Sequence, residues 1–245
     1  LPKVPGYPFV LMGVLGTATV VWGVITGNYF GQELGGPLGR LKLDWFTDDN
    51  LMGLCFLIGA IHLTIAHVWN VIRIINTPQA LAQVGWILIT WFMMFLARYF
   101  VLGEALPAIV LGMGGFGLVL ILLFMTPVRR LKAEFINHAM LPLDIVSNFV
   151  DVVSYVRLFA VGMASLKVAQ SFNGMALQLG WEKIWTVPFI ALILIAGHVL
   201  NIILAALGIL VHAVRLNTLE FSNHIGLEWA GFKYDPFRKR HDNKS

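Results

Sequence analysis

The sequence predicts an all-α, polytopic bundle of about six transmembrane helices, the last two of them long and tilted. Of its 245 residues, 58% are hydrophobic and only 12% are charged. The mean hydropathy is +0.79, and such a composition is typical of integral membrane proteins. Because roughly 20 apolar residues cross a bilayer, we expect residues 1–245 to form one membrane domain. Its spans are 8–29, 50–73, 82–102, 105–126, 141–176 and 185–222.

The first three spans contain small and polar residues for which packing roles are sufficient. Gly23, Gly27 and Gly31 recur every four residues and predict a ridge that another helix approaches closely. In the second span, His62 and His67 are five positions apart, which separates them around a helix and favours structural hydrogen bonds over metal binding. Arg98 is expected near the outer end of the third span, where its side chain can reach the interface.

The remaining spans differ in length and in glycine content. The fourth is rich in glycine at positions 112, 114, 115 and 117, but no lysine follows, so close helix contact is favoured over a nucleotide-binding loop. The fifth and sixth spans exceed one crossing by a wide margin, which predicts tilt.

Charged residues outside the spans predict the topology. The loop with Arg129, Arg130 and Lys132 is basic, and so is the tail 233–244, so both are expected on the cytoplasmic side. Six crossings then place both termini in the cytoplasm and the acidic loop 32–50 outside. A cytoplasmic anchor explains the basic tail better than nucleic-acid binding does.

Polar residues of the fifth span follow one face of the predicted helix. Asp144, Asn148, Asp151 and Tyr155 recur at helical spacing and form a stripe in the cytoplasmic half, with Ser154 beside it. Arg157 points to a different side, flanked by small residues that a large partner can approach. A hydrated helix entry is the simpler alternative for the three polar residues of the stripe.

The sixth span carries a second stripe at alternating spacings of three and four. Its members are His198, Asn201, Ala205, Gly208, His212, Arg215, Leu219 and Ser222. They are predicted to face one neighbour throughout, with Glu220 roughly 8 Å inward of Arg215. His198 and Asn201 either line an outer route or simply form hydrogen bonds between helices.

Two arginines within apolar spans indicate an ion pathway. A buried arginine costs several kcal/mol, about 2.5 by insertion measurements, and it keeps its charge at every accessible pH. Polar residues lie on both sides of the arginines, so the two helices predict two offset half-channels separated by fixed positive charge. Such charges block a direct cation leak, while a moving carboxylate could unload and reload on either side.

Several segments resemble a known family. They are SYVRLFAVGMA around Arg157, GHVLN at His198, VHAVRLNTLEF around Arg215 and YDPF before the basic tail. Together they resemble the membrane domain of the large stator subunit of V-type and A-type rotary ATPases, subunit I in prokaryotes and subunit a in eukaryotes. The opening WGVITGNYFG is similar to an earlier helix of that family.

The resemblance implies the residue roles and the partners. Arg157 and Arg215 match paired arginines that face the proteolipid c/K ring, and Arg157 takes the position essential for translocation. Asp144 stands where prokaryotic relatives have a glutamate, and Glu220 matches an acidic residue beyond the second arginine. The implied protein is not an enzyme by itself and needs no cofactor or metal. Its partners would be the ring, the other rotary ATPase subunits, including peripheral-stalk and central-stalk-associated ones, and membrane lipid.

The family pattern also has departures and leaves alternatives open. Ser165 stands where eukaryotic members have histidine, which favours a prokaryotic cell membrane, and His212 stands where many prokaryotic members have glutamine. The family carries a cytoplasmic half and two helices that this sequence would lack. Protons are preferred over sodium because histidines lie along the route. A secondary transporter of an anionic substrate is the other alternative, although no internal repeat supports it. An intramembrane enzyme is disfavoured because GxSG and HExxH motifs are absent.

Overall fold

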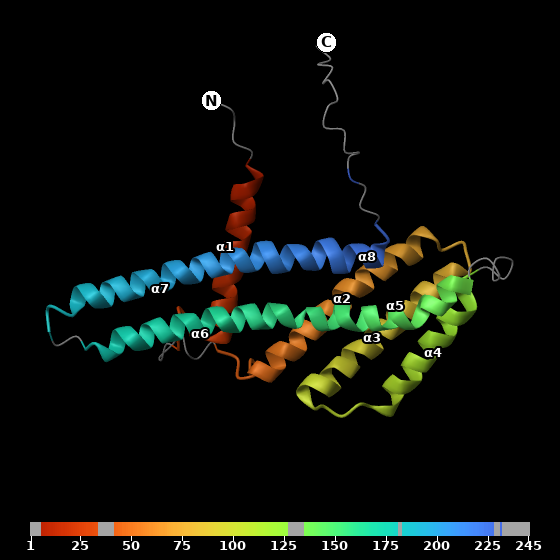
Figure 1. The fold of residues 1–245 in the computed structure, drawn as a ribbon, viewed down its shortest axis with the longest axis horizontal. Helices are drawn as coiled ribbons and strands as arrows, with labels where there is room; N and C mark the ends of the chain where they lie inside the picture. The colour runs from red at the N-terminus through yellow and green to blue at the C-terminus, as the bar shows by residue number, and fades with distance from the viewer. Residues whose placement is uncertain (1–5, 34–41, 127–134, 181–182, 228–230, 232–245) are drawn as a thin grey trace, which may run out of the picture.

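The computed structural model describes residues 6–33, 42–126, 135–180, 183–227 and 231, and they form the predicted helical bundle (Figure 1). The long helices are α1 (Tyr7–Thr26), α2 (Asp48–Arg73), α3 (Gln79–Leu102), α4 (Ala108–Phe124), α5 (Phe135–Ser154), α6 (Val156–Gln178) and α7 (Val187–Gly208). The π-helical segments η3 (Ile209–Ala213) and η4 (Leu216–Phe221) and the short α8 (Ser222–Ile225) continue α7. The basic loop and tail of the predicted topology lie outside the described residues.

Five helical stretches of the described chain are long and apolar enough to cross a membrane. They are Phe9–Thr26, Asp48–Arg73, Gln79–Leu102, His138–Gln178 and Val187–Ile225. The predicted fourth span corresponds to α4, a shorter apolar helix of 17 residues, or about 26 Å at 1.5 Å per residue.

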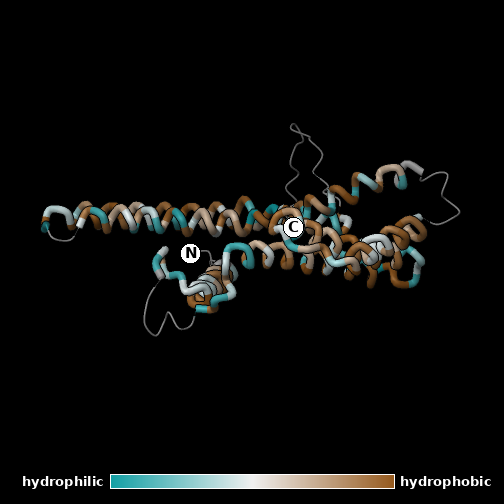
Figure 2. Tube along the Cα trace, turned by 90° about the horizontal axis from the view of Figure 1, so that it is seen from below, coloured by the Kyte–Doolittle hydropathy of each residue, from teal (hydrophilic) through white to brown (hydrophobic). Residues whose placement is uncertain are grey.

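The last two stretches hold 41 and 39 residues. They lie side by side and cross the direction of α1 at a steep angle (Figure 1). Figure 2 shows this pair reaching beyond the other helices, with hydrophilic positions among hydrophobic ones.

The core of the bundle lies where α2, α3, α4 and α5 meet. Phe56, Leu63, Met94 and Ile121 are fully or almost fully buried there. A Cβ at Gly85 would come within 2.7 Å of the Gly117 carbonyl oxygen, so the backbones of α3 and α4 approach closely, as the glycines of the fourth span predicted. This rigid core supports one side of α5 and leaves the α6–α7 pair projecting.

The glycine ridge of the first span is a wrong prediction. Helix α1 ends at Thr26, and Gly27 caps it in the left-handed conformation with φ of 69°. Gly31 then forms, with Phe30, the turn of a two-stranded hairpin, β1 (Asn28–Tyr29) and β2 (Gln32–Glu33). Both turn residues have positive φ, as a tight hairpin turn of this kind requires. The spacing of four therefore reflects a cap and a turn as well as a helix.

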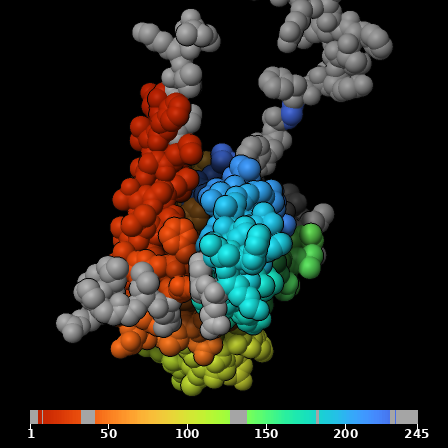
Figure 3. Space-filling model, turned by 90° about the vertical axis from the view of Figure 1, so that its left-hand side faces the viewer, coloured from red at the N-terminus to blue at the C-terminus, as the bar shows by residue number. Residues whose placement is uncertain are grey.

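That hairpin packs on the α6–α7 pair. The Phe30 carbonyl oxygen accepts a hydrogen bond of 2.7 Å from Asn173 Nδ2 on α6, and the Phe30 ring lies edge-on to His198 on α7, 5.5 Å between centroids. In Figure 3, which looks at this end of the molecule, α1 forms a separate column beside the α7 column. The hairpin thus joins the exposed first helix to the long helical pair.

Candidate functional site: a polar line across two long helices

The two arginines share one buried carboxylate. Arg157 Nη1 and Arg215 Nε each lie 3.8 Å from Glu220 Oε1. The Glu220 side chain is 5% exposed, whereas those of Arg157 and Arg215 are 23% and 55% exposed. The structure therefore brings together the three charged residues that the sequence selected near mid-span. One carboxylate faces two guanidinium groups, so this cluster keeps a net positive charge.

Both arginines lie at irregular places in their helices. Arg157 follows a break at Tyr155, where α5 ends and α6 begins; Leu158 N–H donates to the Tyr155 carbonyl oxygen over 3.0 Å, a tighter turn than an α-helix. Arg215 lies between the π-helical segments η3 and η4. Single π turns inside α-helices occur frequently at functional sites. The two arginines are thus held by helix segments that depart from regular geometry.

The register of the sixth span is corrected by these π-helical segments. Leu219 was predicted to face the neighbouring helix, but it is 46% exposed. Leu216 and Glu220 are buried in its place, at 3% and 4% exposure. A π-helix closes i→i+5 hydrogen bonds in place of i→i−4 ones, so an α-helical wheel drawn through Arg215 points to the wrong residues beyond it.

A seat of aromatic residues fixes the break before Arg157. The Tyr155 ring is buried and its hydroxyl lies 2.7 Å from His62 Nδ1 on α2. The His62 ring is stacked on Phe221 of η4, with centroids 4.3 Å apart. His62 therefore links both arginine-bearing helices to the core, and the structural hydrogen bond predicted for it is confirmed.

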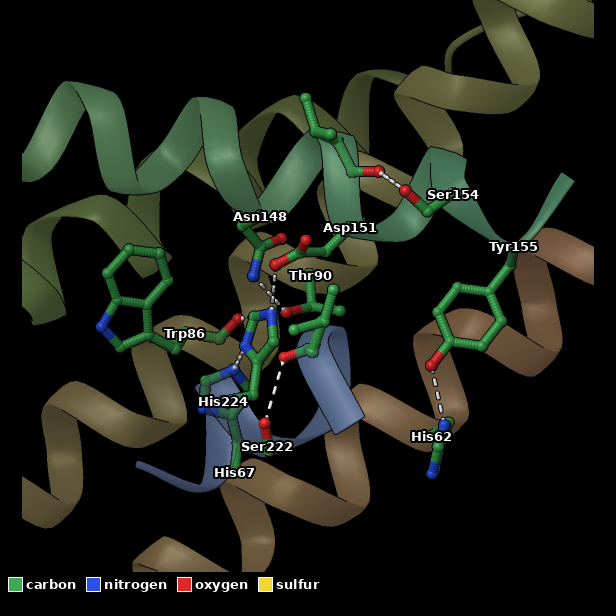
Figure 4. A network of polar contacts seen from close by, with 12 residues as sticks. His62, His67, Trp86, Thr90, Asn148, Asp151, Ser154, Tyr155, Ser222 and His224 are labelled. Carbon is green, nitrogen blue, oxygen red and sulfur yellow. Dashed lines mark hydrogen bonds and ion pairs between the residues drawn. The ribbon is translucent and has the colours of Figure 1, made fainter. Parts of the chain in front are cut away.

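On the inner side of the arginines lies a polar cavity of about 240 Å³. Asp144, Asn148 and Asp151 of the fifth-span stripe all line it, joined by side chains from α2, α3 and α8. Asn148 Nδ2 donates a 3.0 Å hydrogen bond to Thr90 Oγ1 (Figure 4). Ser154, predicted beside them, instead bonds the Val150 carbonyl oxygen of its own helix at 2.8 Å.

A chain of hydrogen bonds crosses the wall of this cavity (Figure 4). Asp151 Oδ2 lies 3.0 Å from His224 Nε2, and His224 Nδ1 lies 2.9 Å from His67 Nε2. His67 Nδ1 lies 2.9 Å from Gln83 Oε1. Sequence reasoning selected Asp151 alone as a lining residue. His224 falls four positions after Glu220, a spacing that could have drawn attention to it.

On the outer side, a second polar contact joins the same helical pair. Ser165 Oγ on α6 donates to Asn201 Oδ1 on α7 across 2.5 Å. His198 is half-buried against Phe30, as described above, and His212 is half-buried on η3. Asn201 therefore does form a hydrogen bond between helices, which was one of the two alternatives for it.

Together these groups form three stations along one antiparallel pair of helices. Asp151 with His224, Arg157 with Glu220, and Ser165 with Asn201 follow in order along α5–α6. From Asp144 to Ser165 the helix rises by about 30 Å, the thickness of a hydrocarbon core. Within the described residues no group of three His, Cys, Asp or Glu side chains could hold a metal ion. Arg98 lies apart from this line and pairs with Glu104 at 2.7 Å.

Comparison with known proteins gives consistent relatives. The chain is 33% identical to V-type ATP synthase subunit I of Borreliella burgdorferi over 94% of its own length and 41% of the relative. It is 35% identical to V-type ATP synthase subunit I 1 of Treponema pallidum, over 92% of the chain and 39% of the relative. The A-type ATP synthase subunit I of Pyrococcus horikoshii is 29% identical, over 91% of the chain and 35% of the relative.

No protein-family model matches the chain, and no solved structure matches it significantly. The chain spans about two fifths of the length of the first two relatives.

The fold and its apolar helices define an integral membrane protein of the helical-bundle class. Over most of its length, the chain is homologous to the V-type and A-type ATP synthase subunit I proteins. These names describe one subunit of an ATP synthase, in agreement with the expectation that the chain is not an enzyme by itself.

Proposed function

We propose that this chain is the ion-translocating membrane domain of a V/A-type rotary ATPase stator subunit. The observation that carries the proposal is Glu220 between Arg157 and Arg215, midway along a line of polar groups on the two longest helices. The inner route comprises Asp144, Asn148 and Asp151 around the cavity. The outer route comprises Asn201, His198 and His212, beyond the arginines.

The proposed mechanism uses fixed positive charge as a barrier. A cation entering the inner route meets two guanidinium groups whose charge one carboxylate neutralises only in part, so it cannot pass directly to the outer route. A carboxylate on a proteolipid ring would release its ion on one side, pass Arg157 and Arg215 as an anion, and take up an ion on the other side. Rotation and ion flow are then coupled.

The proposed partners follow from this mechanism. A proteolipid ring would contact the exposed face of the α6–α7 pair, where Ala160 and Ala164 beside Arg157 are small and exposed. The remaining rotary ATPase subunits would hold the chain against the turning ring. We place the protein in a prokaryotic cell membrane with both termini of the domain in the cytoplasm. Protons are the preferred ion, and a sodium-translocating version of the same complex is the alternative.

The test is Arg157→Ala in the complete ATPase complex, reconstituted into vesicles. Acidification and sodium uptake are measured separately during ATP hydrolysis, and subunit composition is checked on a gel. An assembled complex that no longer pumps supports the proposal, and the ion that wild type moves identifies the coupling ion. Normal pumping by Arg157→Ala overturns it and favours a transporter that uses the arginines to bind an anionic substrate.

A further inference from the structure

We propose that Asp151, His224 and His67 form a proton relay that takes up one proton per passage from the inner cavity and makes this route selective for protons. The inference rests on the proposed function, because it assumes that ions reach the arginines through this cavity. It adds His67 and His224 to the route and names the ion. The two histidines lie 157 positions apart in the sequence, on α2 and α8.

The number of protons in the chain of contacts carries the inference. Three contacts join Gln83, His67, His224 and Asp151, and each contact needs one proton. Two neutral imidazoles supply one proton each, and an ionised carboxylate and an amide oxygen supply none. The arrangement with Gln83 Oε1 toward His67 therefore lacks one proton. It is complete when His224 is doubly protonated and faces the Asp151 carboxylate.

A second arrangement satisfies the same contacts without the extra proton. If the Gln83 amide turns by 180°, its NH₂ group donates to His67 Nδ1, and the orientation of an amide is assigned from its hydrogen bonds. His67 Nε2–H then donates to His224 Nδ1, and His224 Nε2–H donates to Asp151. The chain thus has two fully hydrogen-bonded states that differ by one proton and by the turn of one amide.

Moving between the two states transfers a proton along the chain. A proton from the cavity bonds to His67 Nδ1, the His67 Nε2–H bond breaks, and that proton forms an N–H bond at His224 Nδ1. His224 then carries both ring protons and can pass the one on Nε2 to Asp151 Oδ2, which leaves a neutral imidazole beside a carboxylic acid. The steps are reversible, and no atom other than hydrogen changes its bonds.

The surroundings fit a proton carrier better than a cation site. The 2.9 Å between His67 Nε2 and His224 Nδ1 leaves no room for an ion between the two nitrogens, and hard cations prefer oxygen ligands. Asp144 on α5 and Glu220 on η4 are the other charged side chains near the relay. His224 follows Glu220 by four positions, about one helical turn or ~6 Å of rise, so the relay ends close to the carboxylate that faces both arginines.

The cavity beside the relay can hold water. Its volume of about 240 Å³ is several times the share of one water molecule, ~30 Å³ in the liquid. Asn148 lines it, is 1% exposed, and its Oδ1 is buried without a hydrogen-bond partner. A buried amide oxygen of this kind calls for a donor, and water in the cavity would supply one.

The test measures vesicle acidification by the complete complex carrying His67→Gln or His224→Gln, between pH 6 and pH 9. Glutamine keeps hydrogen bonding but cannot pass a proton on. We expect at least a tenfold loss of pumping at pH 8 to 9 and a smaller loss at pH 6, where protons are abundant. His138→Gln on α5 is the matched control and should keep the wild-type profile. Imidazole added to His224→Gly should restore part of the rate.

Other outcomes separate this inference from the proposed function. If Arg157→Ala abolishes pumping but both glutamine variants follow the His138→Gln profile, the relay is overturned and the stator function stands. The relay is equally overturned if the wild-type complex moves sodium and acidifies nothing. Should the glutamine variants fail to assemble, Gln83→Glu is used, which keeps both histidines. Its carboxylate can only accept from His67 when ionised, so it holds the protonated state and should slow pumping; an unchanged rate contradicts the relay.

Discussion

Gly59 on α2 lies directly against the ring of Tyr155, and a Cβ built on it would come 2.7 Å from Tyr155 Cγ. No real Cβ fits at that distance, so the ring occupies the space that a side chain at position 59 would need. Tyr155 is the residue at which α5 gives way to α6, two positions before Arg157. The absence of a side chain on one helix therefore fixes the direction of another.

Substituting Gly59→Val should displace the Tyr155 ring and shift the break that precedes Arg157. Overpacking of this kind typically costs about 1–3 kcal/mol, and we expect a lower thermal stability of the purified complex together with slower pumping. Gly112→Ala on α4 is the control, since nothing lies within 4 Å of a Cβ there. Equal effects of the two substitutions would show that Tyr155 is not seated as described.

Removing the charge between the arginines should impair pumping without unfolding the protein. In Glu220→Gln, Arg157 and Arg215 keep a neutral hydrogen-bonding neighbour, but no carboxylate balances their charge. We expect at least a tenfold loss of ion pumping in an assembled complex. Glu104→Gln makes the same chemical change in the more exposed pair with Arg98, where ion pairs contribute ~0–1 kcal/mol, and it should pump normally. Wild-type pumping by Glu220→Gln would refute a role for the shared carboxylate.

The buried hydrogen bond between Asn148 and Thr90 should be measurable by a double-mutant cycle. Thr90→Val leaves Asn148 Nδ2 without its acceptor at a site where both side chains are almost fully buried. Within membranes such bonds contribute ~0.6 kcal/mol on average. We expect a coupling free energy of about 0.5–1.5 kcal/mol between Thr90→Val and Asn148→Leu, obtained from SDS-induced unfolding of the full-length subunit. Strict additivity would mean that the bond contributes nothing.

The hairpin contact on the α6–α7 pair should depend on the size of residue 31. A Cβ at Gly31 would lie 2.7 Å from the Ala169 Cβ, and the φ of 82° disfavours any side chain. We expect Gly31→Ala to release the hairpin and to speed hydrogen exchange of the amides in residues 28–33. Gly180→Ala carries a similar backbone penalty, with φ of 70°, but meets nothing within 4 Å. Unchanged exchange in Gly31→Ala would contradict the contact.

Hydrophobic length carried most of the fold prediction. The spans expected at 50–73 and 82–102 correspond to α2 and α3 within three residues at each end, because one crossing requires a fixed number of apolar residues. Gly27 and Gly31 were misjudged because spacing alone does not distinguish a helix ridge from a cap followed by a turn. The end of α1 at Thr26 depends on backbone geometry that residue identity left open.

The charged part of the site was predictable, and its hydrogen-bond partners were not. Arg157, Arg215 and Glu220 stand out in an apolar context, where an ionised side chain is costly. Leu219 was misplaced because a helical wheel assumes an unbroken α-helix. The pairing of His67 with His224 joins α2 to α8, and only the folded arrangement of those helices brings two such distant positions together.

The π-helical segments around Arg215 also affect how the chain tolerates insertions and deletions. A π turn behaves as an α-helix with one surplus residue, so losing one residue between positions 209 and 221 can be absorbed by tightening that turn. The same deletion elsewhere in α7 would rotate every later side chain by ~100° and carry Arg215 off the face that it shares with Glu220. Among homologous sequences, single-residue gaps in this helix should therefore gather on either side of the arginine.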